Sequence, residues 1–417
     1  MCTRKGIRVS VGPGLTADLC LKCNICTSAC PVAAVTDLFP GPKAVGPQAE
    51  RFRHPRLPAP DHSVGWCSGC GVCSRVCPHG VAVTEINVRA KGDLARREGI
   101  SLRDRLIARP ALLGRFGVRF APLANAALMN PIIRRGLEIS LGISREAPLP
   151  AFSTSTLRRR QAAHVARVPT PAAPGEGQPV AYFHGCSAEY YEPWIGELAI
   201  SVLEKLGCRV FLPPQGCCGL PLQSNGLFDA ARRYARWNVQ SLHPFVAAGM
   251  PIVGASTSCT LALKHEYQAI LGLEGVAVSE VAAAVYDVFE FITLYKMEEL
   301  ERLHVSSIPI RALYHPPCQL KSHAIGTPAI EVLQLIPDLE LIHSEAECCG
   351  VAGTYGLKSE KAQVARDVGG ILFDQAGEVS PDLILSDSET CRWWIEKHAG
   401  VKAVHPLQLL AQALDIP

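Results

Sequence analysis

The sequence predicts a chain of mixed class: a small α+β domain at the N-terminus, a helical basic region, and two repeated α/β lobes. Two observations support this prediction. Sixteen of the eighteen cysteines fall into two duplicated patterns. The second half of the chain alternates short apolar strands with amphipathic helices, which is typical of lobes with largely parallel sheets. We expect domains at residues 1–90, 91–179, 180–308 and 309–417.

The composition is that of an ordinary globular protein, with 48% hydrophobic and 19% charged residues. No apolar segment follows the first five residues, so we expect no export signal and a cytoplasmic location. Clustered cysteines in a reducing compartment indicate metal sites rather than disulfides. The longest uncharged run, residues 245–263, contains Pro251 and a serine–threonine stretch. It predicts a buried strand, a loop and a helix start rather than a membrane span.

The first cysteine pattern is C-x2-C-x2-C-x3-C followed by proline, and it occurs twice. Its members are Cys20, Cys23, Cys26 and Cys30, and then Cys67, Cys70, Cys73 and Cys77. In bacterial two-cluster ferredoxins, three cysteines of such a run bind one 4Fe-4S cluster and the fourth binds the other cluster. We therefore assign one 4Fe-4S cluster to Cys20, Cys23, Cys26 and Cys77, and the other to Cys67, Cys70, Cys73 and Cys30. Two zinc sites are the alternative, but zinc sites need no third cysteine at this spacing.

Residues 91–167 are predicted to be helical and are strongly basic. Between Arg89 and Arg167 there are sixteen Lys or Arg and five Asp or Glu, a net charge of +11, whereas the whole chain carries +3. This charge suggests an anionic partner, either an anionic membrane or an acidic protein. The alternative is a helical region whose arginines pair with nearby carboxylates. The proline-rich residues 168–179 predict a linker and a domain boundary.

From residue 180 onward the chain repeats itself at an offset of 131–132 residues, measured between matching cysteines. The first lobe is expected to contain strands at 180–183, 209–212 and 252–255 and helices at 197–206 and 228–247. The second lobe is expected to contain strands at 310–314, 339–342 and 383–386 and helices at 330–335 and 359–375. Cysteines follow the strands, where sites form in parallel sheets. They are Cys186, Cys217, Cys218 and Cys259 in the first lobe, and Cys318, Cys348, Cys349 and Cys391 in the second.

These lobes resemble the cysteine-rich CCG family, which includes the B subunit of heterodisulfide reductase. The family motif is a lone cysteine, a Cys-Cys pair in a turn, and a terminal Cys-x-x-Cys, and it can hold a non-cubane 4Fe-4S cluster. Here Ser256 and Ser388 stand where the terminal Cys-x-x-Cys would begin. Each lobe therefore offers four thiolates for an iron–sulfur cluster, a serine-ligated cluster or zinc, in one or both lobes. Structural cysteines without metal are the remaining alternative.

Nearly the whole chain resembles the iron–sulfur subunits of anaerobic glycerol-3-phosphate dehydrogenase. The segments that carry the resemblance include 20–31, 39–43, 46–51, 183–186, 217–222, 256–260, 348–356, 386–391 and 405–414. The resemblance implies an electron-transfer subunit, peripheral on the inner face of the cell membrane, that accepts electrons from a flavin-containing dehydrogenase subunit and passes them to quinone. It implies no nucleic-acid partner. Because no strand-linked G-x-G-x-x-G occurs, substrate dehydrogenation is expected on the flavoprotein, and we assign no catalytic residue.

Three other functions remain open from the sequence. The chain could be the iron–sulfur subunit of a glycolate or lactate oxidase, which shares this layout. It could instead be a heterodisulfide-reductase-like enzyme that cleaves a disulfide or reduces a quinone at a CCG cluster, although the missing fifth ligands count against disulfide cleavage. A purely structural zinc protein is the third. Cys2 and Cys208 receive no role.

Overall fold

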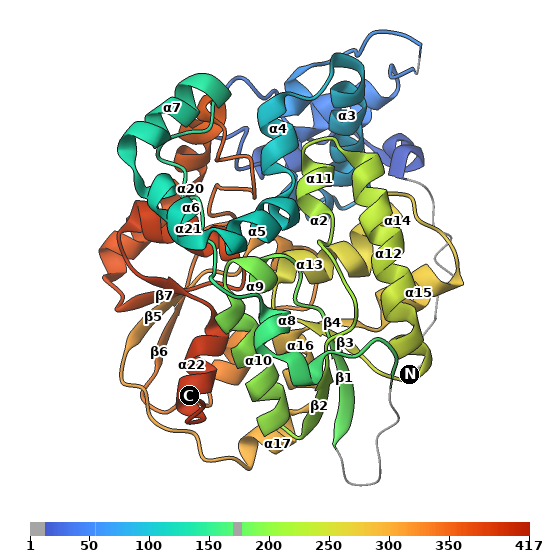
Figure 1. The fold of residues 1–417 in the computed structure, drawn as a ribbon. Helices are drawn as coiled ribbons and strands as arrows, with labels where there is room; N and C mark the ends of the chain where they lie inside the picture. Colours follow the sequence, from blue (N-terminus) through green and yellow to red (C-terminus); the bar gives the residue numbers. More distant parts are fainter. Residues whose placement is uncertain (1–12, 55, 170–176) are drawn as a thin grey trace.

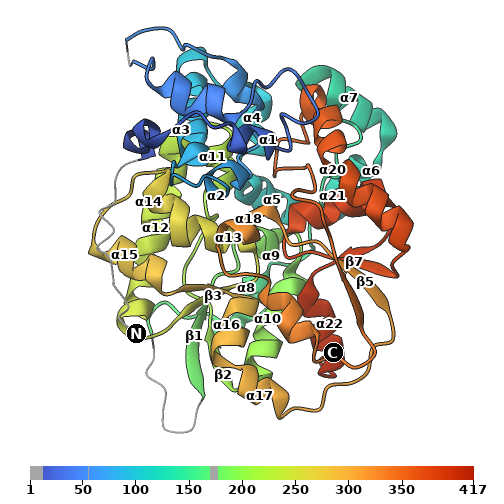
Figure 2. The ribbon, with the colours of Figure 1, turned by 180° about the vertical axis from the view of Figure 1, so that it is seen from behind.

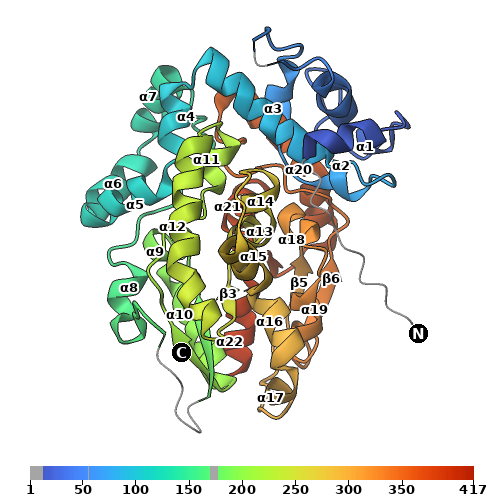
Figure 3. The same cartoon turned by 90° about the vertical axis from the view of Figure 1, so that its right-hand side faces the viewer.

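The computed structural model describes residues 13–54, 56–169 and 177–417 (Figure 1). Cys2 and residues 170–176 of the expected linker lie outside the described residues. The cysteine-rich N-terminal region lies across one end of the two lobes, as the view from behind shows (Figure 2). The basic helices α4–α7 form a separate layer against one side of the lobes (Figure 3).

The described part of the N-terminal region consists of short helices and loops. Its elements are η1 (Pro13–Leu19), α1 (Ile25–Ser28), η2 (Ala44–Gln48), η3 (Ser63–Trp66), α2 (Val72–Arg75) and α3 (Val83–Glu98). Helices α1 and α2 start at equivalent points of the two cysteine runs, after Asn24 (φ 72°) and Gly71 (φ 86°). A left-handed residue at this point turns the chain, so that the third cysteine of each run lies in the helix. Helix α3 crosses residue 90, where the sequence suggested a domain boundary.

The basic region is helical, as the sequence predicts. Its elements are α4 (Leu102–Ile107), α5 (Pro110–Arg119), α6 (Ala121–Met129), α7 (Pro131–Leu141), α8 (Leu157–Arg160) and η4 (Ala162–His164). Pro110 and Pro131 are the first residues of α5 and α7, where proline lacks only an N–H that the helix would not use. Across the described parts of the chain, no helix is both long enough and apolar enough to cross a membrane.

The first lobe is built on a four-stranded parallel sheet with strand order β2-β1-β3-β4. The strands are β1 (Gln178–Tyr182), β2 (Cys208–Phe211), β3 (Ile252–Gly254) and β4 (Val285–Asp287). The helices are α9 (Ser187–Tyr190), α10 (Pro193–Lys205), α11 (Leu220–Ser224), α12 (Phe228–Ala247), α13 (Thr257–Leu261), η5 (Ala262–Glu266), α14 (Tyr267–Ala269), α15 (Val276–Ala283), α16 (Val288–Tyr295) and α17 (Met297–Glu301).

The second lobe repeats this topology, with strand order β6-β5-β7-β8 and all neighbours parallel. Its strands are β5 (Arg311–Tyr314), β6 (Glu340–His343), β7 (Leu383–Leu385) and β8 (Ala403–Val404). Its helices are α18 (Cys318–Ser322), α19 (Pro328–Leu333), α20 (Ser359–Val379), α21 (Glu389–Ala399) and α22 (Pro406–Ala413). The duplication and the parallel sheets are confirmed. Strands β4 and β8 were not expected.

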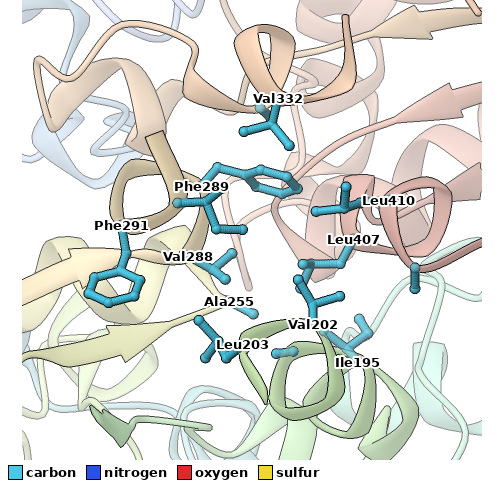
Figure 4. Close-up of a cluster of buried hydrophobic side chains, with 14 of the residues drawn as sticks. Ile195, Val202, Leu203, Ala255, Val288, Phe289, Phe291, Val332, Leu407 and Leu410 are labelled. Carbon is cyan, nitrogen blue, oxygen red and sulfur yellow. The ribbon is translucent and has the colours of Figure 1, made fainter. Parts of the chain in front are cut away.

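One apolar core joins the two lobes (Figure 4). Helices α10 and α16 of the first lobe pack against α22 and α19 of the second. Phe289 of α16 is fully buried between Val332 of α19 and Leu410 of α22, while Leu203 of α10 packs on the other side of the cluster. Burial of this many apolar side chains in one cluster fixes how the two sheets face each other.

Two buried polar contacts further fix the orientation of one lobe relative to the other. The Arg392 guanidinium of the second lobe is 2% exposed and bonds the Glu192 carboxylate of the first lobe at 2.6 Å. The Nε2–H of His405 donates to the carbonyl of Ala255 at 2.9 Å, while its Nδ1 accepts from the N–H of Leu407. Because these bonds lie near the carboxyl ends of both sheets, they hold the cysteine-bearing loops of the two lobes toward each other.

Replacement of Phe289 by alanine should destabilise the protein by about 3–5 kcal/mol, because it leaves a cavity in the core that both lobes share. Leu294→Ala on the same helix is the matched control, since Leu294 is 59% exposed. Denaturant unfolding followed by circular dichroism measures both variants. Equal unfolding midpoints for the two variants would show that the inter-lobe core does not limit stability.

Candidate metal centres

The N-terminal cysteines lie in two groups, each lining its own small cavity. Group A consists of Cys20, Cys23, Cys26 and Cys77. Group B consists of Cys30, Cys67, Cys70 and Cys73. In each group, three cysteines come from one run and one comes from the other run. This is the grouping that the ferredoxin-like spacing predicts.

Electrostatic effects among the thiols show the same grouping. Burial and then the thiols of Cys20 and Cys77 raise the pKa of Cys26. Burial is also the first cause that raises the pKa of Cys73, followed by Cys67 and Cys70. Cys30 links the two groups, because the thiols that raise its pKa after burial include both Cys67 and Cys26.

The lobe cysteines form two further groups at the carboxyl ends of the parallel strands. Group C consists of Cys186, Cys217, Cys218 and Cys259. Group D consists of Cys318, Cys348, Cys349 and Cys391. In group C the Sγ atoms of Cys186 and Cys217 are 3.8 Å apart, and in group D those of Cys349 and Cys391 are 2.9 Å apart.

The Cys-Cys-Gly turn is the same in both lobes. Gly219 (φ 91°) and Gly350 (φ 93°) adopt a left-handed conformation that other residues rarely take. Their N–H groups donate to the Sγ atoms of Cys217 and Cys348, at 3.4 and 3.3 Å. Hydrogen bonds from neighbouring thiols, Cys186 and Cys318 first, and then these N–H groups lower the pKa of Cys217 and Cys348 well below the usual range. The thiolate is the metal-binding form, so each lobe favours the ligating state of one particular cysteine.

Groups B, C and D border one cavity of about 410 Å³, which Cys70, Cys218 and Cys349 all line. Burial raises the pKa of Cys70 to about 12, and the Cys348 thiol of group D is the next cause. Between groups C and D, the Ser256 hydroxyl donates to the Glu389 carboxylate at 3.2 Å. The groups therefore follow one another in space in the order A, B, D, C.

The two serines that replace family cysteines are hydrogen-bonded within the protein. Ser256 donates to Glu389, two residues before Cys391 of the other lobe. The hydroxyl of Ser388 lies 3.3 Å from that of Thr390. The donor set of each lobe is therefore four thiols. Four thiols also surround each N-terminal cavity, which is the donor set of a 4Fe-4S cluster.

Comparison with known proteins assigns a domain family to the N-terminal region and to each of the two lobes. The profile of the 4Fe-4S dicluster domain matches residues 16–81, and that of the cysteine-rich CCG domain matches 180–264 and 312–396. The C subunit of anaerobic glycerol-3-phosphate dehydrogenase from Escherichia coli K12 is 36% identical over 402 residues, covering 95% of this chain and 98% of that protein. The chain belongs to the family of this C subunit. It is therefore an iron–sulfur protein of the oxidoreductase class.

More distant relatives share the layout. The D subunit of dihydromethanophenazine:CoB–CoM heterodisulfide reductase from Methanosarcina barkeri is 24% identical over 407 residues, covering 90% of this chain and 87% of that protein. Lactate utilization protein A from Halalkalibacterium halodurans is 28% identical over 187 residues, covering 43% of this chain and 73% of that protein. The glycerol-3-phosphate dehydrogenase family thus matches over more of the chain than the lactate protein does.

Three lysines near group B were not expected from the sequence. The Lys91 ammonium donates to the carbonyl of Cys67 at 3.1 Å, and that of Lys361 donates to the carbonyl of Gly65. Burial, followed by the charge of Lys358, lowers the pKa of Lys91 to about 8, and burial followed by Lys91 lowers that of Lys361 to about 6. A cluster with four thiolate ligands is anionic, so at group B it would favour the protonated form of these lysines, whose charge would then compensate it. No sequence spacing connects residues 91 and 361, because the fold alone brings them together.

The histidines beside the lone lobe cysteines are buried and neutral. Burial is the main cause that lowers the pKa of both His184 and His315 to about 4. The Nδ1–H of His184 donates to the carbonyl of Gly185 at 2.7 Å, and the Nδ1 of His315 lies 3.3 Å from the Ser344 hydroxyl. Within the described residues, no three His, Cys, Asp or Glu side chains converge on one point at metal-binding distance. The cysteines instead surround cavities.

Cys23→Ser removes one ligand of group A, and Cys70→Ser removes one ligand of group B. Each variant should therefore lose one 4Fe-4S cluster, about four irons per chain. Electron paramagnetic resonance of the dithionite-reduced protein should lose a different signal in each variant. Cys208→Ala is the matched control, since this buried cysteine of β2 belongs to none of the four groups. If both serine variants keep both signals, the assignment of ligands is wrong.

Proposed function

We propose that this chain is the electron-transfer subunit of a membrane-associated anaerobic glycerol-3-phosphate dehydrogenase. It would accept electrons from a flavin-containing subunit and pass them to the quinone pool at the inner face of the cell membrane. The observation that carries the proposal is the succession of cysteine groups from exposed Cys23 in group A to the cavity bordered by groups B, C and D. Iron–sulfur clusters bound at these groups would supply single-electron transfer.

An exposed apolar surface surrounds group A. Leu19, Leu21 and Ile25 are 52%, 69% and 45% exposed, and Cys23 beside them is exposed as well. Apolar side chains gathered around a redox site favour contact with a protein partner. We assign this surface to the flavin subunit, because electrons must enter at the group that lies nearest to solvent.

The opposite side of the molecule carries the basic helices (Figure 3). Their exposed apolar side chains include Leu102, Leu112, Phe116, Phe120, Leu123, Met129, Ile132 and Ile139. Arg105, Arg115, Arg119 and Arg135 on the same helices are exposed, and within the described residues their side chains make no hydrogen bond or ion pair. Apolar side chains with unpaired arginines are typical of helices that lie in the interface of an anionic membrane.

Other arginines of this region have structural partners, as the alternative interpretation of the sequence expects. The Arg134 guanidinium is buried and donates to the carbonyls of Ser144 and Ala147 at 2.8 and 2.6 Å. Arg103 forms a bidentate pair with Glu360 of α20, at 2.7 and 2.8 Å. The Arg103 pair attaches the helical layer to the second lobe, whereas the Arg134 contacts hold the loop that follows α7. Arg105, Arg115, Arg119 and Arg135 remain for a membrane surface.

The protein purified without oxygen should contain at least about eight irons per chain, from the two ferredoxin-type clusters. Glycerol 3-phosphate should reduce these clusters only when the co-purified flavin subunit is present. Leu21→Asp should weaken that co-purification, whereas Ile371→Asp, at a 63% exposed site on α20, should not. Reduction by lactate or glycolate instead would assign the chain to the alternative oxidases.

Replacing Leu123, Ile132 and Ile139 together by aspartate should abolish flotation with anionic liposomes, because these side chains are 74%, 80% and 77% exposed and would enter the lipid. Removing Arg115, Arg119 or Arg135 should weaken binding roughly fivefold each, from about 1 kcal/mol per arginine near an anionic surface. Val276→Asp is the control at an equally exposed site on α15. Flotation of the triple variant at the wild-type level would contradict membrane docking by these helices.

A further inference from the structure

We infer that the cavity between groups C and D and the helical layer is a binding site for a lipid-soluble quinone, with Glu266 as its proton donor. This inference rests on the proposed function and locates the site at which quinone is reduced. Three features of the cavity support it: apolar walls that reach the surface at the membrane-facing helices, cysteines of three groups on the opposite side, and a buried carboxyl group.

The walls toward the helical layer are apolar. They include Leu106 of α4, Leu113 of α5, Leu128 of α6 and Leu137 of α7, with Ile143 and Phe152 from the following loop. Leu106 and Leu113 are also 37% and 39% exposed, so the cavity reaches the surface between these helices. A long isoprenoid chain matches such walls, since it would move from the apolar surroundings of the membrane to equally apolar leucine side chains.

The opposite side of the cavity holds the redox groups. Cys218 of group C, Cys349 of group D and Cys70 of group B all line it. A quinone ring at this end would therefore lie next to the groups that would deliver its electrons. A small polar substrate such as glycerol phosphate does not fit the leucine-lined entrance, which offers no cation to a phosphate.

Two carboxyl groups line the same cavity, Glu266 and Glu389, and Glu389 accepts a hydrogen bond from Ser256. Gln223 of α11 and Glu266 of η5 are 4% and 8% exposed, and the Gln223 amide donates to a Glu266 oxygen at 3.1 Å. Burial raises the pKa of Glu266 to about 7, so the carboxyl group exchanges protons near neutral pH. The neighbouring charged groups are His265 and Glu85, which bond each other at 3.2 Å, and the His265 side chain is 53% exposed.

Reduction of one quinone to a quinol consumes two electrons and two protons. Clusters held by these cysteines would supply the two electrons one at a time, after the flavin subunit had reduced them while oxidising its substrate. Each proton leaves the Glu266 carboxyl group for a quinone oxygen. In this proposal Glu266 then regains a proton from water, with the neighbouring pair of His265 and Glu85 as its relay. The electrons would therefore approach the ring from the cysteine side of the cavity, and the protons from η5 of the first lobe.

Photolabelling tests the cavity without requiring turnover. Anaerobically purified, iron-loaded protein is irradiated with an azido-naphthoquinone of short side chain, with 2,3-dimethyl-1,4-naphthoquinone as competitor. The label should appear on the segments that line the cavity, within residues 68–70, 106–152, 186–191, 218–266, 317–319, 348–357 or 388–393. Leu113→Trp and Leu137→Trp should reduce labelling at least tenfold, because the larger ring fills the entrance. Leu294→Trp, at a 59% exposed site away from the cavity, should not. Labelling elsewhere, or unchanged labelling in both entrance variants, would overturn the site.

Glu266→Gln separates proton transfer from binding. This variant should keep wild-type iron content, photolabelling and cluster reduction by the flavin subunit, while quinone reduction falls about 100-fold. In the wild type, the rate should fall as pH rises through about 7, since the donor is the protonated carboxyl group, and the variant should lack this inflection. Glu298→Gln, at an exposed glutamate, is the control.

A Glu266→Gln rate equal to that of the wild type, with the same pH profile, would overturn the proton-donor role. Failure of the flavin subunit to reduce the clusters would instead contradict the proposed function. The labelling result is independent of that step, so the two failures are distinguishable.

Discussion

The shared core between the two lobes is the constraint on which the candidate sites depend. Each sheet by itself places four cysteines beyond its own strands. Packing of Phe289 and its neighbours between α16, α19 and α22 makes the carboxyl ends of both sheets face one cavity. The contact of Ser256 with Glu389 exists only in this arrangement. A rotation of one lobe would separate groups C and D while leaving each lobe folded.

Burial of so many thiols requires compensating interactions. Burial alone disfavours the thiolate, as the raised pKa values of Cys73 and Cys218 illustrate. The structure supplies N–H donors at Gly219 and Gly350, and it places buried lysines beside group B. The lysines lie between the N-terminal region and the second lobe, where Lys91 and Lys361 donate to the carbonyls of Cys67 and Gly65. Packing of the two regions and electrostatic compensation at this interface therefore depend on each other.

The sequence predicts most of the fold because its signals are local. Helix α12 begins and ends at the predicted residues, 228 and 247, and the three expected strands of each lobe lie within two residues of their predicted bounds. Strands β4 and β8 have three and two residues, too few to show a period, and no cysteine motif follows them as it follows the equally short β3 and β7. Glu266 and Lys361 could not be identified, because an isolated charged residue gives no sign that the fold will bury it. The division of the arginines into paired and unpaired ones likewise depends on tertiary contacts.

The duplicated lobes have the same local structure but different neighbours, and this difference gives the electron route its direction. Cys318 and Cys348 of the second lobe lie beside Cys70, where α18 packs on α2. This lobe is therefore in contact with the ferredoxin-like region at its cysteines. The first lobe carries Glu266 on the cavity, whereas the residue 132 positions later is His398, whose ring packs against that of Trp394 in α21. The first lobe therefore has a carboxyl group at this position of the repeat, and the second lobe does not. If electrons enter through the second lobe and protons through the first, a quinone is reduced where the two lobes meet. The two copies of the lobe then have different roles in one reaction: the second delivers electrons and the first delivers protons.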